Sequence, residues 1–255
     1  MFASNIPSAQ ELNEYYSDYP VKSHRSPITI NRYNELLDRF EQFRSTRNIL
    51  DIGCGTGYFL DEAEKRGWQV HGTEYSPSSI ASCRERGLLI HEGDLDVNNY
   101  SLEQFDVITS FEVIEHINDP KSELDKVKRV LRTGGLFYVT TPNFNSLSRN
   151  MVGSEWNIVN YPEHLSYYTP KTIHRVLTDS GFKKEWVKTT GFSVSRFKSS
   201  TNIEKQENVD PKNDDEKLRS KMEYNPLLKA VKWSINLGLD LFGKGDALKA
   251  GYIKK

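Results

Sequence analysis

Three glycines at alternate positions follow an acidic residue in the segment 51–57, which reads Asp-Ile-Gly-Cys-Gly-Thr-Gly. Apolar residues before this segment predict a short strand, and residues 56–66 predict a helix, so the glycines lie in the turn between them. Glycines let the chain turn sharply and let a ligand approach its backbone, and the N–H groups at a helix start attract a carboxylate or a phosphate. The segment therefore predicts a ligand-binding loop.

A second acidic residue supports this prediction. Glu74 ends the next predicted strand, residues 68–75, and comes 23 positions after Asp51. A carboxylate at this place in a parallel sheet can accept both hydroxyls of a ribose, so the ligand is expected to contain a nucleoside. A dinucleotide site requires the pattern Gly-x-Gly-x-x-Gly, but Tyr58 stands where the third glycine belongs. This departure argues against a nicotinamide cofactor.

Carboxylates and imidazoles form a second candidate constellation. Glu112, Glu115 and His116 follow the predicted strand 105–110, and they converge if the chain turns into a helix there. His164 lies in a later segment expected to arch over the strand ends. This set suits a divalent metal with mixed oxygen and nitrogen ligands, and His164 alone suits a general base for an acceptor hydroxyl. In the plainer interpretation Glu112 touches the ligand, while the other two begin a helix and His164 is a polar loop residue.

Short strands and helices alternate along most of the chain, and several of the helices end at a glycine. Such alternation is typical of a parallel sheet covered by helices on both faces. We therefore expect an α/β fold with a doubly wound, mostly parallel sheet of seven strands. The expected strands span residues 48–52, 68–75, 88–91, 105–110, 136–141, 182–190 and 247–253, and the expected helices include residues 56–66, 77–86, 120–131 and 170–180.

The rest of the chain is divided by composition. An aromatic lead-in and an apolar stripe that starts after Ser26-Pro27 predict a lid and a helix over residues 1–45, and residues 46–199 form the core. An irregular acceptor-side insertion is expected at 143–169, and a charged, mobile segment at 200–217. Residues 218–255 are expected to supply a last helix and strand of the same domain.

A helical stripe within this last part is predicted to pack in the core rather than on a membrane surface. Its members are Leu228, Val231, Ile235, Leu239 and Phe242.

Composition excludes several classes of protein. The 255 residues include 34 basic and 35 acidic side chains, so the near-zero net charge argues against a dedicated nucleic-acid binder. Two cysteines are too few for a disulfide scaffold. The chain has no apolar run of about 20 residues and no visible secretory signal, and we therefore expect a cytoplasmic protein without a membrane span.

Five motifs, taken in order between residues 48 and 182, resemble those of the class I S-adenosylmethionine (SAM)-dependent methyltransferases. The first is the glycine loop, which matches Asp-x-Gly-x-Gly-x-Gly. The resemblance implies a Rossmann-like sheet and SAM as the cofactor. The other four are Gly72-Thr-Glu-Tyr-Ser, Gly93-Asp-Leu, Phe105-Asp-Val-Ile and Val130-Leu-Arg-Thr-Gly-Gly-Leu-Phe.

The resemblance also implies which residues contact each part of SAM. The methionine part lies along the glycines, with the first acidic residue supporting the loop and the amino group. The ribose lies at the second acidic residue, the adenine at the Gly-Asp-Leu motif, and the methyl end past the fourth strand. The implied residues are Asp51, Gly53, Gly55, Gly57, Glu74, Tyr75, Asp94, Leu95, Phe111 and Glu112.

The second constellation resembles the Glu-x-x-Glu-His element, with a later histidine, of metal-assisted methyltransferases. Those enzymes act on the terminal ribose of small RNAs, and a similar element occurs in ubiquinone-pathway catechol O-methyltransferases. The resemblance implies Mg²⁺ or another divalent metal at Glu112, Glu115, His116 and His164. The balanced charge argues against an RNA acceptor.

The expected function is SAM-dependent O-methylation of a small-molecule or sugar hydroxyl. The tail from Phe242 to Leu248 and the segment from Trp156 to Thr169 resemble bacterial methyltransferases associated with polysaccharide sugars. A catechol-like quinone precursor is the alternative acceptor. A nicotinamide-dependent oxidoreductase and a non-catalytic cofactor-binding partner subunit are the rival classes, and the sequence leaves the oligomeric state open.

Overall fold

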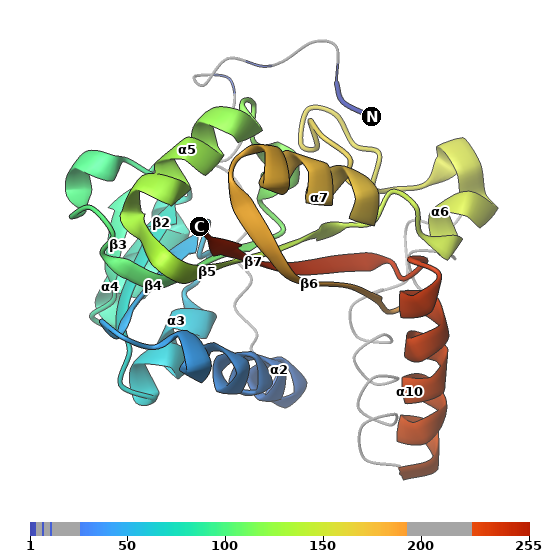
Figure 1. The fold of residues 1–255 in the computed structure, drawn as a ribbon, viewed down its shortest axis with the longest axis horizontal. Helices are drawn as coiled ribbons and strands as arrows, with labels where there is room; N and C mark the ends of the chain where they lie inside the picture. Colours follow the sequence, from blue (N-terminus) through green and yellow to red (C-terminus); the bar gives the residue numbers. More distant parts are fainter. Residues whose placement is uncertain (4–6, 8–10, 12–25, 193–225) are drawn as a thin grey trace.

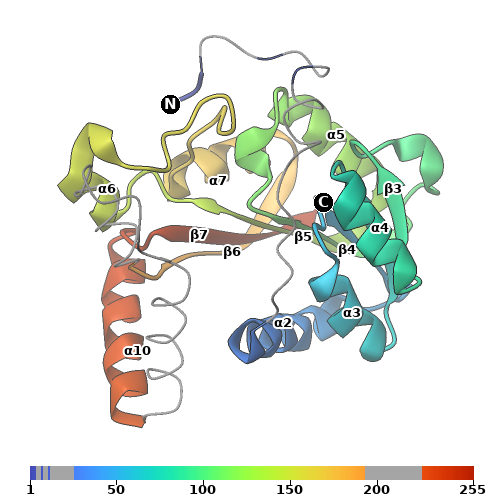
Figure 2. The same cartoon turned by 180° about the vertical axis from the view of Figure 1, so that it is seen from behind.

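The computed structural model of the chain describes residues 1–3, 7, 11, 26–192 and 226–255. A seven-stranded sheet runs through its centre in the order β3-β2-β1-β4-β5-β7-β6, with helices on both faces (Figures 1 and 2). The predicted α/β fold with a mostly parallel, doubly wound sheet is confirmed. The strands are β1 (Asn48–Ile52), β2 (Gln69–Glu74), β3 (Leu89–Glu92), β4 (Phe105–Phe111), β5 (Leu131–Pro142), β6 (Phe182–Thr190) and β7 (Ala247–Lys254).

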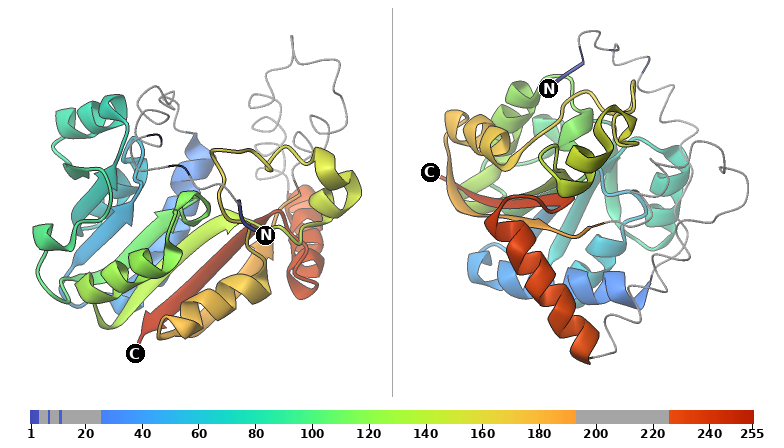
Figure 3. Two further views of the ribbon diagram at one scale, coloured as in Figure 1. Left: turned by 90° about the horizontal axis from the view of Figure 1, so that it is seen from above. Right: turned by 90° about the vertical axis from the view of Figure 1, so that its right-hand side faces the viewer.

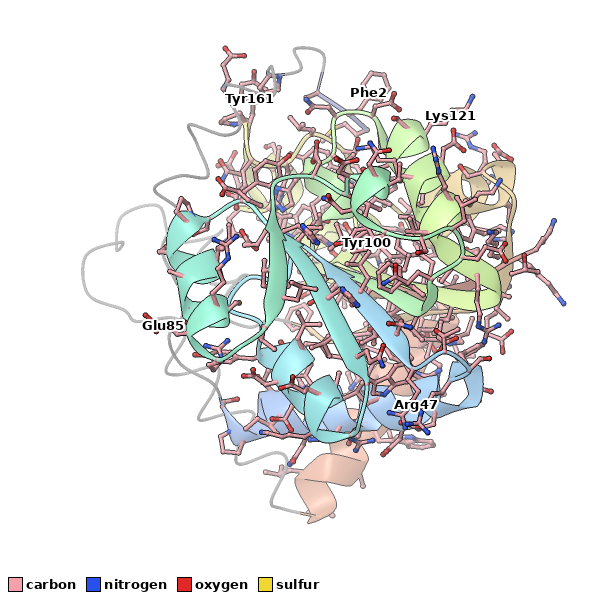
Figure 4. All side chains as sticks on the ribbon, turned by 90° about the vertical axis from the view of Figure 1, so that its left-hand side faces the viewer. Phe2, Arg47, Glu85, Tyr100, Lys121 and Tyr161 are labelled. Carbon is pink, nitrogen blue, oxygen red and sulfur yellow. The ribbon has the colours of Figure 1, made fainter. Side chains whose placement is uncertain are left out.

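Helices α2, α3 and α4 cover one face of the sheet, and α5 and α7 cover the other. Each face has its own hydrophobic cluster, so the sheet is buried on both sides, as a parallel sheet requires. Figure 4 shows Glu85 on α4 and Lys121 on α5 pointing away from the sheet. The helices are α2 (Pro27–Phe40), α3 (Tyr58–Lys65), α4 (Pro77–Glu85), α5 (Pro120–Val130), α6 (Leu147–Val152), α7 (Pro170–Asp179) and α10 (Pro226–Leu241).

Four of these helices begin with the same local device. Ser26, Ser76, Asp119 and Thr169 each cap a helix through a side-chain oxygen, and each is followed by proline at the first helical position. The cap oxygen accepts a backbone N–H that the helix leaves unpaired, which contributes about 1 kcal/mol, and proline loses no hydrogen bond there. These starts are readable from sequence because the device lies within a few neighbouring residues.

The order of the strands reverses between β1 and β4. β1 pairs in parallel with β2 on one side and with β4 on the other, and the chain continues outward in both directions. In such sheets the carboxyl ends of the two central strands leave a crevice between the loops that follow them. Both candidate constellations follow strands at this end of the sheet.

β7 interrupts the parallel pattern, since it lies antiparallel between β5 and β6. The turn before it is tied to the start of the insertion by the amide of Asn143, which donates to the carbonyls of Gly243 (3.0 Å) and Gly245 (2.7 Å). Segments about 100 residues apart in sequence therefore hold one edge of the site.

The insertion at residues 143–169 is less irregular than expected. It contains the helix α6, capped by Ser146, whose hydroxyl accepts the N–H of Arg149 at 3.2 Å. A short 3₁₀ turn, Gly153–Glu155, follows it. The expectation of a wholly irregular segment was wrong because a one-residue cap is enough to start a helix of six residues.

The predicted burial of the C-terminal stripe is wrong. α10 extends away from the sheet edge (Figures 1 and 3), and Val231, Ile235 and Phe242 are 47%, 51% and 77% exposed. Its contacts with the sheet lie near its end, where Asp240 accepts the N–H of Thr189 at 2.7 Å. Periodicity predicted the helix correctly, but it could not tell that most of the helix lies beyond the sheet.

Two predictions lie outside the described residues. These are the mobile character of 200–217 and the part of the N-terminal lid before residue 26, apart from its few described positions. Among the described helices, none is long and apolar enough to cross a membrane.

Candidate active site

A cavity of about 900 Å³ lies at the carboxyl ends of β1, β2 and β4, at the reversal point of the sheet. This volume is near the upper end of the range of about 300–1,000 Å³ for small-molecule sites. Two groups of residues face each other across it. The loop side comprises residues 51–56 and 74–76. The histidine side comprises Glu112, Val113, Glu115, His116, Ile158, Glu163 and His164.

The Glu74 carboxylate organises the loop side. One of its oxygens accepts the N–H of Gly55 at 2.7 Å, and the other accepts those of Tyr75 and Ser76, both at 2.9 Å. A carboxylate offers about four acceptor positions, so one remains for a ligand hydroxyl. A ribose that donates both hydroxyls to Glu74 needs a second acceptor position, the one that the Gly55 N–H occupies.

The glycines of the loop serve different purposes. Gly53, Gly55 and Gly57 all have a positive φ, which favours glycine. A Cβ at Gly53 would meet Val113 at 2.6 Å, and one at Gly57 would meet Leu88 at 2.6 Å. A Cβ at Gly55 would meet no atom within 4 Å, so this glycine alone presents bare backbone to open space.

Asp51 is buried behind the loop, and it accepts a hydrogen bond of 2.7 Å from the hydroxyl of Thr109. Burial raises the pKa of Asp51 to about 8, although the Thr109 hydrogen bond acts in the opposite direction. The Glu74 carboxylate adds to the rise. A cationic group in the cavity would therefore favour ionisation of Asp51.

Most of the predicted cofactor residues line this cavity, including Tyr75, Asp94, Phe111 and Glu112. Two predicted contacts lie elsewhere. Gly57 starts α3 and backs onto the core, and Leu95 is 1% exposed and packs in the hydrophobic cluster below β4. The Gly-Asp-Leu motif thus brings its aspartate to the cavity and its leucine to the core, because consecutive side chains point in different directions.

Phe111 and Glu112 close the end of β4. The Phe111 ring packs against Phe59 and Tyr33, at centroid distances of 5.0 and 6.1 Å. Glu112 adopts φ +55°, a conformation that costs a residue with a side chain about 1–3 kcal/mol, and its N–H donates to the carbonyl of Thr140 at 3.0 Å. The neighbouring strand β5 thus fixes the turn that leads into the histidine side.

Glu115 is the most unusual carboxylate of the site. It is 2% exposed on the short 3₁₀ turn Ile114–His116, and neither side-chain oxygen has a hydrogen-bond partner among the residues that the structure describes. Nε2 of His116 lies 3.9 Å from one of these oxygens, too far for a hydrogen bond. Burial and the nearby Glu112 carboxylate raise its pKa well above the ordinary value. Burial of a carboxylate without a hydrogen bond costs free energy, and a proton or a cation would reduce that cost.

His116 and His164 stand beside this carboxylate, with ring centroids 4.8 Å apart. Nδ1 of His116 lies 2.6 Å from the Glu163 carbonyl, and Nδ1 of His164 lies 2.7 Å from the Ile158 carbonyl. A carbonyl can only accept, so in both rings Nδ1 carries the proton. Burial lowers the pKa of His116 to about 4, which keeps this ring neutral at pH 7 with its lone pair on Nε2.

The three side chains fit a metal ion chemically. One ligand atom from each of Glu115, His116 and His164 can be chosen so that all lie within 4.8 Å of one another. Two ligands of one ion at about 2.1 Å are at most about 4.2 Å apart, so a shared ion needs a small approach. The two Nδ1–H···O=C bonds are the outer interactions typical of metal-binding histidines. The predicted fourth ligand, Glu112, lines the cavity but does not belong to this group.

The insertion reaches the histidine side through main-chain bonds. The N–H groups of Leu165 and Ser166 donate to the carbonyl of Glu115, at 2.8 and 3.0 Å. Met1 lies alongside, where its carbonyl accepts the N–H of Tyr167 at 2.9 Å. Tyr161, at the tip of this loop, points away from the molecule (Figure 4).

Sequence reasoning assigned no role to three supporting groups. Thr109 orients Asp51, and the carbonyls of Ile158 and Glu163 fix the tautomers of the histidines. Main-chain carbonyls carry no signal in the sequence. A threonine two residues before the end of a buried strand is a weak signal that was available.

Curated relatives share part of the chain. A ubiquinone biosynthesis O-methyltransferase of Cereibacter sphaeroides is 30% identical over 145 residues, which cover 52% of this chain and 59% of the relative. One of Aeromonas salmonicida is 28% identical over 143 residues, covering 51% and 60%. The chain thus spans less than two thirds of the length of these relatives.

Solved structures share the fold. A SAM-dependent methyltransferase of Archaeoglobus fulgidus has a TM-score of 0.58 at 16% identity, covering 88% of this chain and 93% of that chain. The [4+2]-cyclase SpnF has a TM-score of 0.57 at 18% identity, covering 94% and 85%. A family model described as a methyltransferase domain matches residues 23–187, more than half of the chain. This match, together with the fold, shows that the chain belongs to the methyltransferase domain family.

Proposed function

We propose that the protein is a SAM-dependent O-methyltransferase that acts on a small acceptor with adjacent hydroxyl groups. The observation that carries this proposal is the placement of the buried Glu115 carboxylate and two imidazoles, with Nδ1 of each bonded to a carbonyl, in one cavity with the glycine loop. The family and the names of its relatives support the transfer of a methyl group.

The loop side would hold SAM. Gly55 offers bare backbone, Glu74 offers an acceptor for ribose, and Asp51 lies behind the loop where it can receive the ammonium of the methionine part. Tyr75 and Asp94 line the cavity beyond them, where the adenine would lie. Bound SAM supplies a methyl group that is already activated on a sulfonium, so the chain has to align the acceptor and exclude water.

The histidine side would hold the acceptor. Glu115, His116 and His164 are the residues that would bind Mg²⁺ or another divalent metal, with Glu112 at the rim. Such an ion would lower the pKa of an acceptor hydroxyl and fix its position. Nδ1 of His164 donates to the Ile158 carbonyl and Nδ1 of His116 to the Glu163 carbonyl, which turns the Nε2 side of each ring away from these bonds.

His164 has a second possible role within the same proposal. Because its Nδ1 is bonded to the Ile158 carbonyl, its Nε2 can accept the proton of an acceptor hydroxyl directly. In that mechanism no metal is needed. Glu115 then acts by stabilising the cationic imidazole through its nearby carboxylate.

Two acceptor classes remain in view. The names of the curated relatives favour an aromatic acceptor of the kind found in ubiquinone biosynthesis. The segment from Phe242 to Leu248 resembles methyltransferases associated with polysaccharide sugars, so a sugar hydroxyl stays a predicted acceptor. Both offer adjacent oxygens to a cation. The likeness to a cyclase shows that this fold alone does not decide the reaction, so the proposal depends on the site.

Calorimetric titration with S-adenosylhomocysteine (SAH) tests the loop side. We expect saturable binding by the unmodified chain and none with NAD. Absence of SAH binding would refute the proposal and return the oxidoreductase to consideration. Binding without methyl transfer to any catechol or sugar diol would favour the non-catalytic partner subunit.

The histidine side is tested by titration with Mg²⁺ and Mn²⁺ of the unmodified chain, of Glu115→Ala and of Glu123→Ala. Glu123 is a matched control, because it is also a buried carboxylate that lines the cavity but is paired with Lys126 at 3.1 Å. We expect metal binding to be lost in Glu115→Ala and retained in Glu123→Ala. An equal loss of metal binding in both variants, or no binding heat with the unmodified chain, would refute the metal site. His164 would then act as the general base.

A further inference from the structure

The C-terminal helix α10 presents polar side chains to the protein and apolar side chains to its surroundings. Asn236 and Asp240 lie one turn apart, and their side chains accept the N–H groups of Gly191 at 2.8 Å and of Thr189 at 2.7 Å. This is the reverse of the arrangement of a helix that covers a core. Six large apolar residues of the same segment are 45–77% exposed, namely Val231, Trp233, Ile235, Leu237, Leu241 and Phe242.

The apolar residues of α10 lie on both sides of its polar stripe. Lys232, Asn236 and Asp240 follow one another at four-residue spacing, so they share one face of the helix. Because consecutive residues of a helix are about 100° apart, the residues before and after each of these three flank the stripe. The apolar surface therefore takes up more than half of the circumference. The flanking pairs are Val231 and Trp233, Ile235 and Leu237, and Leu239 and Leu241.

We propose that α10 docks the protein on an anionic lipid surface, with its apolar side chains inserted at the boundary between headgroups and acyl chains. Lipid fits the width of the apolar surface, because it can surround every side of the helix that the sheet edge leaves exposed. A second protein helix covers a narrower stripe, so a pair of helices would leave one flank of α10 in water. The proposal goes beyond the proposed methyl transfer and does not depend on it.

The length and the aromatic residues of α10 fit a helix that enters one leaflet. Its 16 residues span about 24 Å, less than the hydrocarbon core of about 30 Å. Trp233 is 66% exposed, and tryptophan is enriched where lipid meets water. Figure 3 shows α10 beyond the edge of the sheet, where a flat surface can reach it. We therefore expect the helix to lie in the interface and not across the bilayer.

The charges beside the helix suit an anionic surface. Both carboxylates of residues 187–192 and 230–246 are bonded inside the protein. Asp240 accepts the main-chain bond described above, and Asp246, which is 4% exposed, accepts the hydroxyl of Ser148 at 2.5 Å. The cations outnumber these carboxylates, and they are Lys188, Lys232 and Lys244. A lysine near anionic lipid strengthens binding roughly fivefold, so headgroup charge should matter.

Co-sedimentation of the full-length chain with lipid vesicles tests the docking. We expect binding to vesicles of equal parts phosphatidylglycerol and phosphatidylcholine to be at least about tenfold tighter than binding to phosphatidylcholine alone. Trp233→Asp should weaken binding to the anionic vesicles by at least about tenfold, because a charge replaces a large inserted ring.

Leu102→Asp is the matched control, and it should not change vesicle binding. Leu102 is 68% exposed, much like Trp233, but it lies in the turn before β4. Its neighbour Glu103 bonds to Lys254 at 2.8 Å, at the end of β7 that is remote from α10. Both aspartate variants should keep the SAH affinity and the urea unfolding midpoint of the unmodified chain, because neither residue lines the cavity.

The fluorescence of Trp233 gives a second readout that needs no charged substitution. The other three tryptophans, Trp68, Trp156 and Trp186, are buried or half-buried. Insertion of α10 into lipid should therefore change the emission mainly through Trp233. We expect a blue shift when anionic vesicles are added to the unmodified chain. Trp233→Phe should still sediment with these vesicles but show no shift.

Several results would overturn the proposal. These are no sedimentation with anionic vesicles, equal binding to both kinds of vesicle, and equal losses in Trp233→Asp and Leu102→Asp. A lipid-free dimer that Trp233→Asp dissociates, measured by analytical ultracentrifugation, would assign the apolar surface to a second copy of the chain instead. Failure of the unmodified chain to bind SAH would refute the proposed function and leave the vesicle result standing.

Discussion

The carboxylates on the two sides of the cavity differ in their hydrogen bonds. On the loop side, Glu74 is held by three N–H groups and Asp51 by the hydroxyl of Thr109. On the histidine side, Glu115 is more deeply buried than Glu74 and has no hydrogen-bond partner among the described residues. The loop side is therefore preorganised by its own backbone, whereas the histidine side is complete only with a proton or a cation.

The largest expected effect is a loss of SAH affinity in Glu74→Ala without a loss of metal binding. Glu74→Ala removes the acceptor of three N–H groups, and hydrogen bonds to a charged group contribute about 1.5–3 kcal/mol, so SAH affinity should fall by roughly 10–100-fold. Metal binding should not change. The control is Glu92→Ala, because Glu92 is the register partner of Glu74 on β3 but is exposed. Equal effects of both variants on SAH binding would contradict the assigned role of Glu74.

Substitution by alanine should mainly affect stability at Gly72 and mainly affect SAH binding at Gly55. A Cβ at Gly72 would meet Ile90 at 2.7 Å and the Cys54 sulfur at 2.9 Å, so Gly72→Ala should lower the free energy of unfolding by about 1–3 kcal/mol. A Cβ at Gly55 has open space but a positive φ, so Gly55→Ala should cost about 1 kcal/mol and mainly weaken SAH binding. Denaturant unfolding measures the stability of each variant, and calorimetry measures its SAH affinity. If Gly55→Ala lowered only stability and Gly72→Ala lowered only SAH affinity, Gly55 would not face the ligand.

The pH dependence of SAH binding should report Asp51. Since its pKa is raised to about 8, the group is largely protonated at pH 6.5, and a ligand ammonium must displace that proton. Affinity should therefore rise about tenfold between pH 6.5 and pH 8 and then level off. Proton release, measured by calorimetry in buffers of different ionisation enthalpy, should accompany binding. In Asp51→Asn both the rise and the release should be absent.

The smallest expected effect concerns stability without metal. The pKa of Glu115 is raised in the folded state, so the folded protein binds more protons than the unfolded one above pH 4.5. Its contribution to stability is greatest below that pH and is lost as the pH rises toward the folded pKa. Glu115→Gln should flatten this loss in urea unfolding curves between pH 5 and 8. A flat curve for the unmodified chain would contradict the raised pKa of Glu115.

The same contrast explains what the sequence could predict. The loop side is built from short motifs whose members are neighbours in the chain. The sequence therefore predicted its strand and placed Gly53, Gly55 and Glu74 at the cavity, whereas Gly57 faces the core. The histidine side needs a loop that is 47 residues further on at the His116–Glu163 contact. The sequence predicted that Glu115, His116 and His164 converge, but it did not predict the groups that orient the two rings. The carbonyls of Ile158 and Glu163 act through the main chain, which any residue type supplies.

Exposure was the least predictable property. The stripe on α10 has the same spacing as the buried stripe on α2, yet Val231 and Ile235 lie in the open while Leu37 and Phe40 are fully buried. Helical spacing reports which residues share a face, but it does not report what that face meets. Placement of the helix relative to the sheet edge decides that, and it depends on the turn at residues 243–246.

The place of β7 in the sheet sets an order of assembly. β6 pairs with β7 and not with β5, although residues 191–246 separate β6 from β7 in the chain. During synthesis, which delivers the N-terminal part first, β1 to β5 can pair as they appear, but β6 must wait for β7. A chain cut at residue 246 would thus lose β7 and, with it, the pairing partner of β6. The insertion likewise depends on the end of the chain, because Asn143 bonds to the carbonyls of Gly243 and Gly245.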